Sequence, residues 1–152
     1  MYLNRNRRER KQLYNFGKRK LQVIHTRIRT SCSSLNYHLF SKNIVASPLC
    51  ECGSVESAQH YFFECPLYDH IRPLFITSIS NHTMATVHTV LYGDDSKDYD
   101  TNIKIFEIVH KYIESSKRFD WLSILLSQVT LALTPAHMAV LFLSTSSDFQ
   151  LH

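Results

Sequence analysis

Glycine and proline are scarce in this sequence, with 3 and 4 residues among 152. Strands joined by tight turns need more of both, so an all-β sandwich or barrel is disfavoured. Apolar residues make up 44% of the chain, which is enough to build a hydrophobic core. The length suits one small domain, or a smaller domain with tails, and we expect it to be mainly α.

The first residues also lack the pattern of a secretory signal peptide. The opening run MYLNRNRRERK is basic throughout, and no apolar core follows a short basic start. We therefore expect a reducing compartment, nuclear or cytoplasmic, in which cysteines are not paired as disulfides.

Acidic residues are nearly missing from the first part of the chain. Residues 1–29 hold ten Lys or Arg against Glu9 alone, a net charge of +9, whereas the remainder sums to −5. A dense basic arm gains free energy on RNA or DNA by releasing condensed counterions, and it can also serve as a nuclear import signal. The alternative is a solvated, disordered end. The candidate nucleic-acid-binding residues are Arg7, Arg8, Lys18, Arg19, Lys20, Arg27 and Arg29.

Three segments show apolar residues at helical spacing, and they predict helices over residues 20–30, 35–41 and 100–119. The first has arginines on its other face, and the last has the most regular pattern. The expected N-caps are Ser33-Ser34 for the second helix and Asp100 or Thr101 for the third. The positions expected to face the core are Leu21, Ile24 and Ile28, then Leu35 and Leu39, then Ile105, Phe106, Val109, Tyr112 and Ile113.

Three of the four cysteines fall in PLCECGSVESAQHYFFECPLY, where the spacing is Cys50-x-Cys52-x7-His60-x4-Cys65. Gly53 allows a tight turn or short hairpin after the first two thiols, and a helix from residue 57 carries the histidine until Pro66 stops it. Thiolates and one imidazole are the ligands that zinc prefers in tetrahedral sites. The segment therefore predicts a structural Zn²⁺ knuckle with four protein ligands.

The alternative reading of this segment is a set of ordinary buried cysteines with an ordinary histidine. Three thiols and an imidazole within sixteen residues, in a chain without a secretion signal, favour the metal. Cys32 stands apart and is expected to be a core or surface thiol. The aromatic run after His60 fills the small core in one interpretation and stacks nucleobases in the other.

Residues 25–75, HTRIRTSCSSLNYHLFSKNIVASPLCECGSVESAQHYFFECPLYDHIRPLF, combine this knuckle with other features. The combination resembles the C-terminal segment of reverse transcriptases from non-LTR (LINE-type) retrotransposons of animals, over roughly residues 15–119. The resemblance implies a segment downstream of the polymerase that helps to hold template RNA or target DNA. The features that carry it, beside the knuckle, are Arg27-x-Arg29, Leu35-Asn36, His38-Leu39, Glu56, Tyr61-Phe62-Phe63, Cys65-Pro66, Tyr68 and Arg72.

The run Tyr92-Gly93-Asp94-Asp95 has the sequence pattern of the metal-binding hairpin of a polymerase. That hairpin also needs an upstream aspartate, the preceding fingers and a following apolar strand, and the sequence contains none of these. The Pro-Asp pair typical of the restriction-like endonuclease in some related elements is missing too, since Pro66 and Asp69 are not adjacent. We expect no catalysis and no small-molecule substrate.

Charged residues are missing altogether between Trp121 and Leu143. The segment is long enough to cross a bilayer, so a tail-anchored membrane protein is one alternative, although polar residues near its middle weaken insertion.

A second alternative is a relic open reading frame left from a truncated element. The favoured interpretation is a zinc-stabilised nucleic-acid-binding fragment without polymerase activity.

The predicted organisation has four parts. They are a disordered basic arm over residues 1–19, a zinc-knuckle helical region over 20–80, a loop and amphipathic helix over 81–119, and an apolar tail over 120–152. The sequence contains no signal for an oligomeric state.

Overall fold

The computed structural model describes residues 13–120. Most of the predicted basic arm and nearly all of the apolar tail, including the possible membrane segment over 121–143, lie outside the described residues. The chain divides into two compact units after Lys117, and the fold described below is that of residues 13–117.

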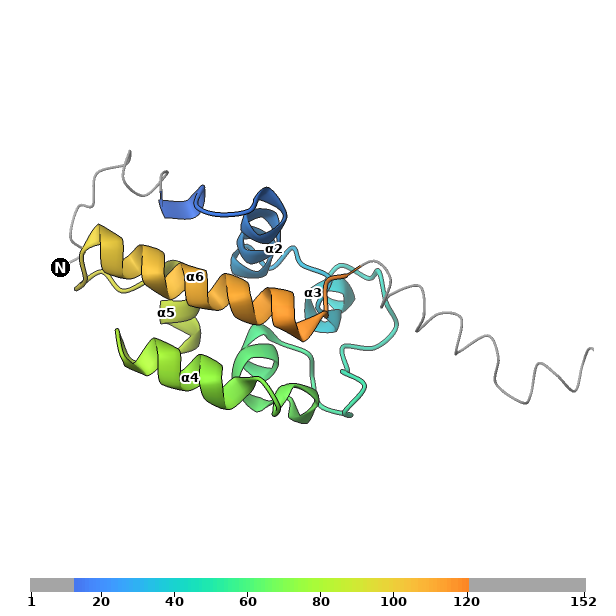
Figure 1. The fold of residues 1–152 in the computed structure, drawn as a ribbon. Helices are drawn as coiled ribbons and strands as arrows, with labels where there is room; N and C mark the ends of the chain where they lie inside the picture. Colours follow the sequence, from blue (N-terminus) through green and yellow to red (C-terminus); the bar gives the residue numbers. More distant parts are fainter. Residues whose placement is uncertain (1–12, 121–152) are drawn as a thin grey trace, which may run out of the picture. The chain divides into compact units, whose positions relative to one another are not determined.

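The predicted mainly α class is confirmed (Figure 1). The described residues contain no β-strand beyond an isolated antiparallel bridge between Leu49 and Val55. The elements are α2 (Arg19–Arg29), α3 (Asn36–Phe40), the π-helical turn η1 (His60–Glu64), the 3₁₀ turn η2 (Pro66–Tyr68), α4 (Arg72–Ser80), α5 (Val87–Tyr92) and α6 (Tyr99–Ser116).

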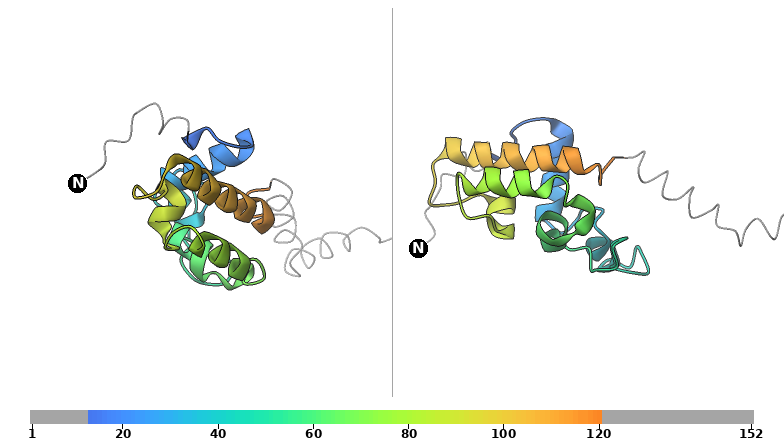
Figure 2. Two further views of the ribbon diagram at one scale, coloured as in Figure 1. Left: turned by 60° about the vertical axis from the view of Figure 1, so that its left-hand side comes forward. Right: turned by 60° about the horizontal axis from the view of Figure 1, so that its bottom comes forward.

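Helix α6 is the element around which the others pack. It contacts α2, α4 and α5, and α4 runs antiparallel beside it (Figures 1 and 2). All five apolar positions predicted for its inner face are buried. Two polar side chains, Asn102 and His110, are buried with them and were not anticipated.

The predicted N-cap of α6, Asp100 or Thr101, is wrong by two or three residues. Asp98 caps the helix, and its carboxylate accepts a hydrogen bond from the Thr101 backbone N–H at 2.6 Å. Aspartate at this position satisfies one of the free N–H groups of the first turn, so the helix starts at Tyr99 rather than after Asp100.

Helix α2 forms where predicted, with Leu21 and Ile28 buried and Ile24 only partly so. Its end is a Schellman turn, in which Ser31 has φ of 54° and the Cys32 N–H reaches the Arg27 carbonyl at 2.7 Å. The turn ends the helix without a glycine.

Helix α3 also forms where predicted, but its N-cap is Leu35 and not Ser33-Ser34. The Ser33 hydroxyl instead accepts the Leu35 N–H at 3.3 Å, one residue before the helix. The cap is supplied from elsewhere in the sequence, because the Glu56 carboxylate accepts the Asn36 N–H at 2.7 Å. Leu35 is fully buried, whereas Leu39 is only partly covered.

Helices α4 and α5 were not predicted, and α5 occupies part of the expected loop after residue 81. Helix α5 starts at a capping box in which Thr86 and Thr89 bond each other's backbone N–H groups. It ends at Gly93, whose φ is +80° and where a Cβ would overlap Asn102 Oδ1. The Tyr-Gly-Asp-Asp run therefore lies at the end of a helix and in the turn after it.

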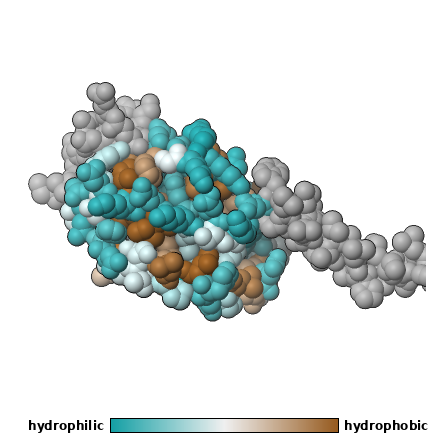
Figure 3. Space-filling model, in the orientation of Figure 1, coloured by the Kyte–Doolittle hydropathy of each residue, from teal (hydrophilic) through white to brown (hydrophobic). Residues whose placement is uncertain are grey.

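The core contains a cluster of aromatic rings that joins η1, η2, α4 and α6. Tyr61 and Phe62 have no exposed surface, and Tyr112 contacts both. For these two residues the core interpretation is confirmed and base stacking is wrong. On the face seen in Figure 3 the surface is mostly hydrophilic, with separate hydrophobic patches.

Candidate metal centre

The first two cysteines lie on a tight hairpin. The Leu49–Val55 bridge closes its base, and the Cys50 N–H donates to the Ser54 carbonyl at 2.7 Å. Gly53 takes φ of +90°, a conformation that L side chains rarely adopt, which lets the chain reverse directly after Cys52. Both thiols are thereby held on one short turn.

The other two residues are His60, which begins the π-helical turn, and Cys65, which follows it directly. The Cys65 N–H donates to the His60 carbonyl at 2.8 Å, a bond between residues five apart. Such a turn brings the first and sixth residues to the same side, which an α-helix does not do at this spacing. The helix predicted here is thus a π turn, and it ends before Pro66 as expected.

All four predicted ligands converge. One ligand atom from each of Cys50, Cys52, His60 and Cys65 lies within 4.8 Å of all the others. The Sγ atoms of Cys50 and Cys65 are 3.6 Å apart, those of Cys52 and Cys65 4.0 Å, and Cys52 Sγ lies 3.2 Å from His60 Nε2. The group can hold one metal ion.

These distances suit tetrahedral coordination. Zinc–sulfur bonds of about 2.3 Å at tetrahedral angles place two sulfur atoms about 3.8 Å apart, and sulfur and nitrogen about 3.6 Å apart. These three of the six separations fall within a few tenths of an ångström of those values, and no pair is farther apart than 4.8 Å. A metal would therefore fit once the wider pairs close by about 1 Å or less.

The three thiols have different electrostatic surroundings. Burial raises the pKa of Cys65 to about 12 and also raises that of Cys50. The pKa of Cys52 is lowered, first by a hydrogen bond from the Ser54 backbone. A divalent cation binds thiolates and displaces their protons, so its charge would reverse the effect of burial.

A carboxylate lies near the far side of the imidazole, beyond hydrogen-bonding distance. His60 Nε2 points to Cys52, while Nδ1 lies 4.0 Å from the exposed Glu64 carboxylate one turn later. A closer approach of Glu64, to hydrogen-bonding distance, would favour the tautomer whose Nε2 is free to bind metal.

Polar bonds connect the hairpin to α3, and a further one lies at the start of α3. Glu56, which follows the hairpin, is only 2% exposed and caps α3 through Asn36, whose side chain in turn donates to the Leu49 carbonyl at 2.5 Å. Ser33 and His38 form a further buried bond of 2.8 Å. In the sequence, Glu56 and His38 contribute only to the resemblance, and neither had a predicted structural role.

A second connection runs from the centre to α4 and α6. The Arg72 guanidinium donates to the Cys65 carbonyl and to Asp69, and its Nε is buried without a hydrogen-bond partner. The Tyr112 hydroxyl donates to the Tyr61 carbonyl at 2.8 Å, next in the chain to the candidate ligand His60. Through these bonds the metal segment is part of the same core as α6.

The predicted nucleic-acid-binding residues separate into three groups. Arg7 and Arg8 lie outside the described residues. Lys18, Arg19, Lys20 and Arg27 are exposed, and Lys18 pairs with Glu114 at 2.8 Å.

Arg29 is engaged inside the fold. Its Nε donates to the Leu91 carbonyl at 2.5 Å, and its guanidinium lies 3.8 Å from the centre of the Tyr14 ring. This arginine ties α2 to α5.

Cys32 is an exposed surface thiol outside the metal group, with Lys42 Nζ 3.0 Å from its Sγ.

Between residues 13 and 120, no helix is long and apolar enough to cross a membrane.

The chain was compared with protein-family models, with curated proteins and with solved structures. It matches none in any of the three sets.

Proposed function

We propose that the Cys50, Cys52, His60 and Cys65 group binds one Zn²⁺ as a structural centre. The observation that carries this proposal is the convergence of three sulfur atoms and one imidazole nitrogen within 4.8 Å. Soft thiolates with an imidazole favour zinc over magnesium or calcium, which prefer oxygen ligands. Four protein ligands complete a tetrahedron and leave no position for a reacting water, so the ion would act in folding.

The structural role follows from what the four ligands join. The hairpin supplies two ligands and the π turn supplies two, and the buried Glu56 connects the hairpin to α3. The described segment from residue 45 to 57 contains no helix, and its backbone bonds are those of the hairpin, such as Cys50 to Ser54, with one bond from the Tyr37 N–H to the Glu56 carbonyl. Binding of the ion would supply the free energy that orders this segment.

We further propose that the chain binds RNA or DNA and lacks polymerase and endonuclease activity. The support is a segment, residues 13–50, that contains six Lys or Arg and no Asp or Glu. Lys20 and Arg27 are exposed and two turns apart on α2, which places them on one side of that helix. The resemblance to the C-terminal segment of LINE-type reverse transcriptases agrees with this function and with a nuclear or cytoplasmic location.

Salt dependence of binding tests this proposal. The full chain is titrated against a labelled single strand by fluorescence anisotropy at several salt concentrations. Each phosphate contact contributes about 0.7 to the slope of log K against log salt on single strands, so Lys20→Gln with Arg27→Gln should lower the slope by about 1.4. The control is Lys104→Gln with Lys111→Gln, an equal charge change two turns apart on α6, where both side chains are exposed.

Comparing the α2 double variant with the α6 double variant decides whether α2 is the contact surface. Equal losses of slope in both variants would mean that only net charge matters and that α2 is not the contact surface. Absence of binding by the unaltered chain at low salt would contradict the nucleic-acid proposal altogether, while leaving the zinc centre unaffected.

A further inference from the structure

Helix α3 presents two aromatic rings to solvent. Tyr37 is 48% exposed and Phe40 is 43% exposed, and residues three apart lie on the same face of a helix. The inward side of α3 is occupied by buried Leu35 and His38. The rings are thus available on the outer side of a helix whose inner side is fixed in the core.

The position of α3 is set by the metal segment. Besides the Glu56 cap, the Tyr37 N–H donates to the Glu56 carbonyl at 3.3 Å, and the Asn36 side chain bonds the Leu49 carbonyl on the hairpin. The other end is closed by a Schellman turn in which Asn43 has φ of 55° and the Ile44 N–H bonds the Leu39 carbonyl. Both ends of this short helix are therefore held, which makes it a fixed support for its rings.

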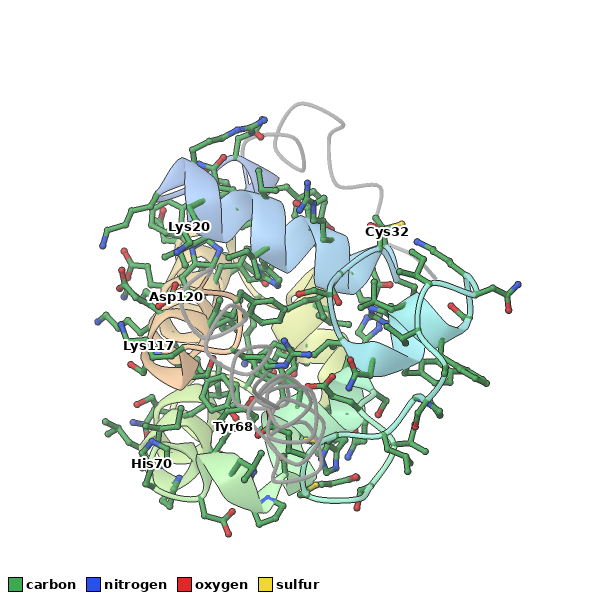
Figure 4. The ribbon with its side chains drawn as sticks, turned by 90° about the vertical axis from the view of Figure 1, so that its right-hand side faces the viewer. Lys20, Cys32, Tyr68, His70, Lys117 and Asp120 are labelled. Atoms are coloured by element: carbon green, nitrogen blue, oxygen red, sulfur yellow. The ribbon has the colours of Figure 1, made fainter. Side chains whose placement is uncertain are left out.

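Two cations belong to the segments that adjoin α3 in the chain. Lys42 follows α3 and reaches Cys32, and Arg27 lies in the last turn of α2, where its carbonyl bonds the Cys32 N–H. Both positive charges act on the exposed Cys32 thiol and lower its pKa, the hydrogen bond from Lys42 most of all. Figure 4 shows Lys20 near one end of α2 and Cys32 past the other, next to α3.

The distances along α3 fit a nucleic acid strand. Residues 37 to 40 span about 4.5 Å at the helical rise of about 1.5 Å per residue. Stacked nucleotides repeat about every 3.4 Å along a strand, so the spacing of the two positions is comparable to the step between two neighbouring nucleotides. Exposed rings in a segment with several Lys and Arg and no acidic residue are the elements of a single-strand binding surface.

We propose that Tyr37 and Phe40 stack unpaired bases of a single-stranded RNA or DNA whose phosphates contact Arg27 and Lys42. This inference rests on the proposed function, which requires nucleic-acid binding but specifies neither unpaired bases nor α3. A duplex keeps its bases stacked on one another and cannot offer their faces to the rings. The site therefore selects single strands.

The test compares single strands with duplexes. The full chain, loaded with zinc, is titrated against a labelled oligouridine, an oligothymidine and a duplex, by fluorescence anisotropy at one salt concentration. The variant Tyr37→Leu with Phe40→Leu keeps apolar side chains and the charge but removes both π faces. We expect its affinity for the two single strands to fall at least about fivefold, and its affinity for the duplex to stay unchanged.

A control variant and a mapping experiment make the result specific. Tyr99, on α6, is 39% exposed, and Tyr99→Leu should leave all three affinities unchanged. Zinc content and the thermal midpoint of each variant show whether the fold is retained. Ultraviolet crosslinking of the unaltered chain to an oligonucleotide with 4-thiouridine, followed by peptide mass spectrometry, should place the crosslink at Tyr37 or Phe40.

The outcomes separate this inference from the proposed function. Equal loss on single strands and duplex, or no loss on either, would overturn the stacking site even if Lys20 and Arg27 prove necessary for binding. No binding of any nucleic acid by the unaltered chain would overturn both proposals. Loss on RNA but not on DNA would retain the site and identify RNA as its ligand.

Discussion

The buried histidine His25 should make the protein less stable in mild acid. Its Nε2 lies 2.8 Å from the Val90 carbonyl oxygen, which only accepts, so Nε2 carries the proton and the ring is neutral. The ring packs edge-on against Phe106 and His110. The perturbation is His25→Gln, which retains an N–H donor for Val90 but cannot become charged.

The magnitude follows from the pKa difference between folded and unfolded chains. Burial above all, then the charges of Arg29 and His110, lowers the pKa of His25 to about 3. In the unfolded chain the value is about 6.5, so the unfolded state binds more protons between about pH 6.5 and about pH 3. The free energy of unfolding contributed by His25 is intact above about pH 6.5, and about 2 kcal/mol of it is lost by about pH 5.

Urea unfolding of the zinc-loaded full chain, followed by far-ultraviolet circular dichroism, measures this loss. Between about pH 7.5 and about pH 5 the unaltered chain should lose about 2 kcal/mol more than His25→Gln. Proton competition at the metal ligands is the same in both chains and cancels in the difference. Equal losses in the two chains would refute the reasoning that His25 is buried as a neutral ring.

The adjacent pair Phe62 and Phe63 should differ sharply, because Phe62 has no exposed surface and Phe63 is only partly covered. Phe62→Ala should lower the free energy of unfolding by about 3–5 kcal/mol and Phe63→Ala by clearly less, as measured by urea titration; similar losses would contradict the placement of these rings. Glu56→Gln should cost about 1–3 kcal/mol, because the cap it makes with Asn36 becomes a neutral bond. Thermal unfolding measures this second effect, and an unchanged midpoint would show that the cap contributes nothing.

Local patterns were sufficient for some of the fold. The long helix α6 was predicted because eighteen residues repeat an apolar stripe, and such a stripe specifies a helix without reference to distant parts. The convergence of the four candidate metal ligands was predicted because all four lie within sixteen residues, so spacing along the chain reports their proximity. In both cases the information is contained in a single continuous segment.

Other parts depend on contacts between distant segments. Helix α4 has nine residues, β-branched side chains and no side-chain N-cap, so its stability comes from packing on α6 rather than from its own sequence. Arg29 was expected on the surface, yet its partner Leu91 is 62 residues away. Nothing near Arg29 in the sequence distinguishes it from Arg27, which is exposed.

The burial of His25 belongs to the same group of long-range effects, since its partner Val90 is 65 residues away. One local signal was available, because His25 occupies the inner face of α2 between Leu21 and Ile28. A polar residue on an apolar stripe implies a buried partner, although the sequence does not say which one.

Native mass spectrometry of the reduced full chain, supplied with zinc and then with a chelator, tests the metal centre most directly. We predict one zinc per chain in the unaltered protein and in Cys32→Ser, and none in Cys52→Ser, because Cys52 belongs to the four-ligand group and Cys32 does not. A chain that binds no zinc, or that loses it equally in both variants, would contradict the assignment of Cys50, Cys52, His60 and Cys65 as its ligands.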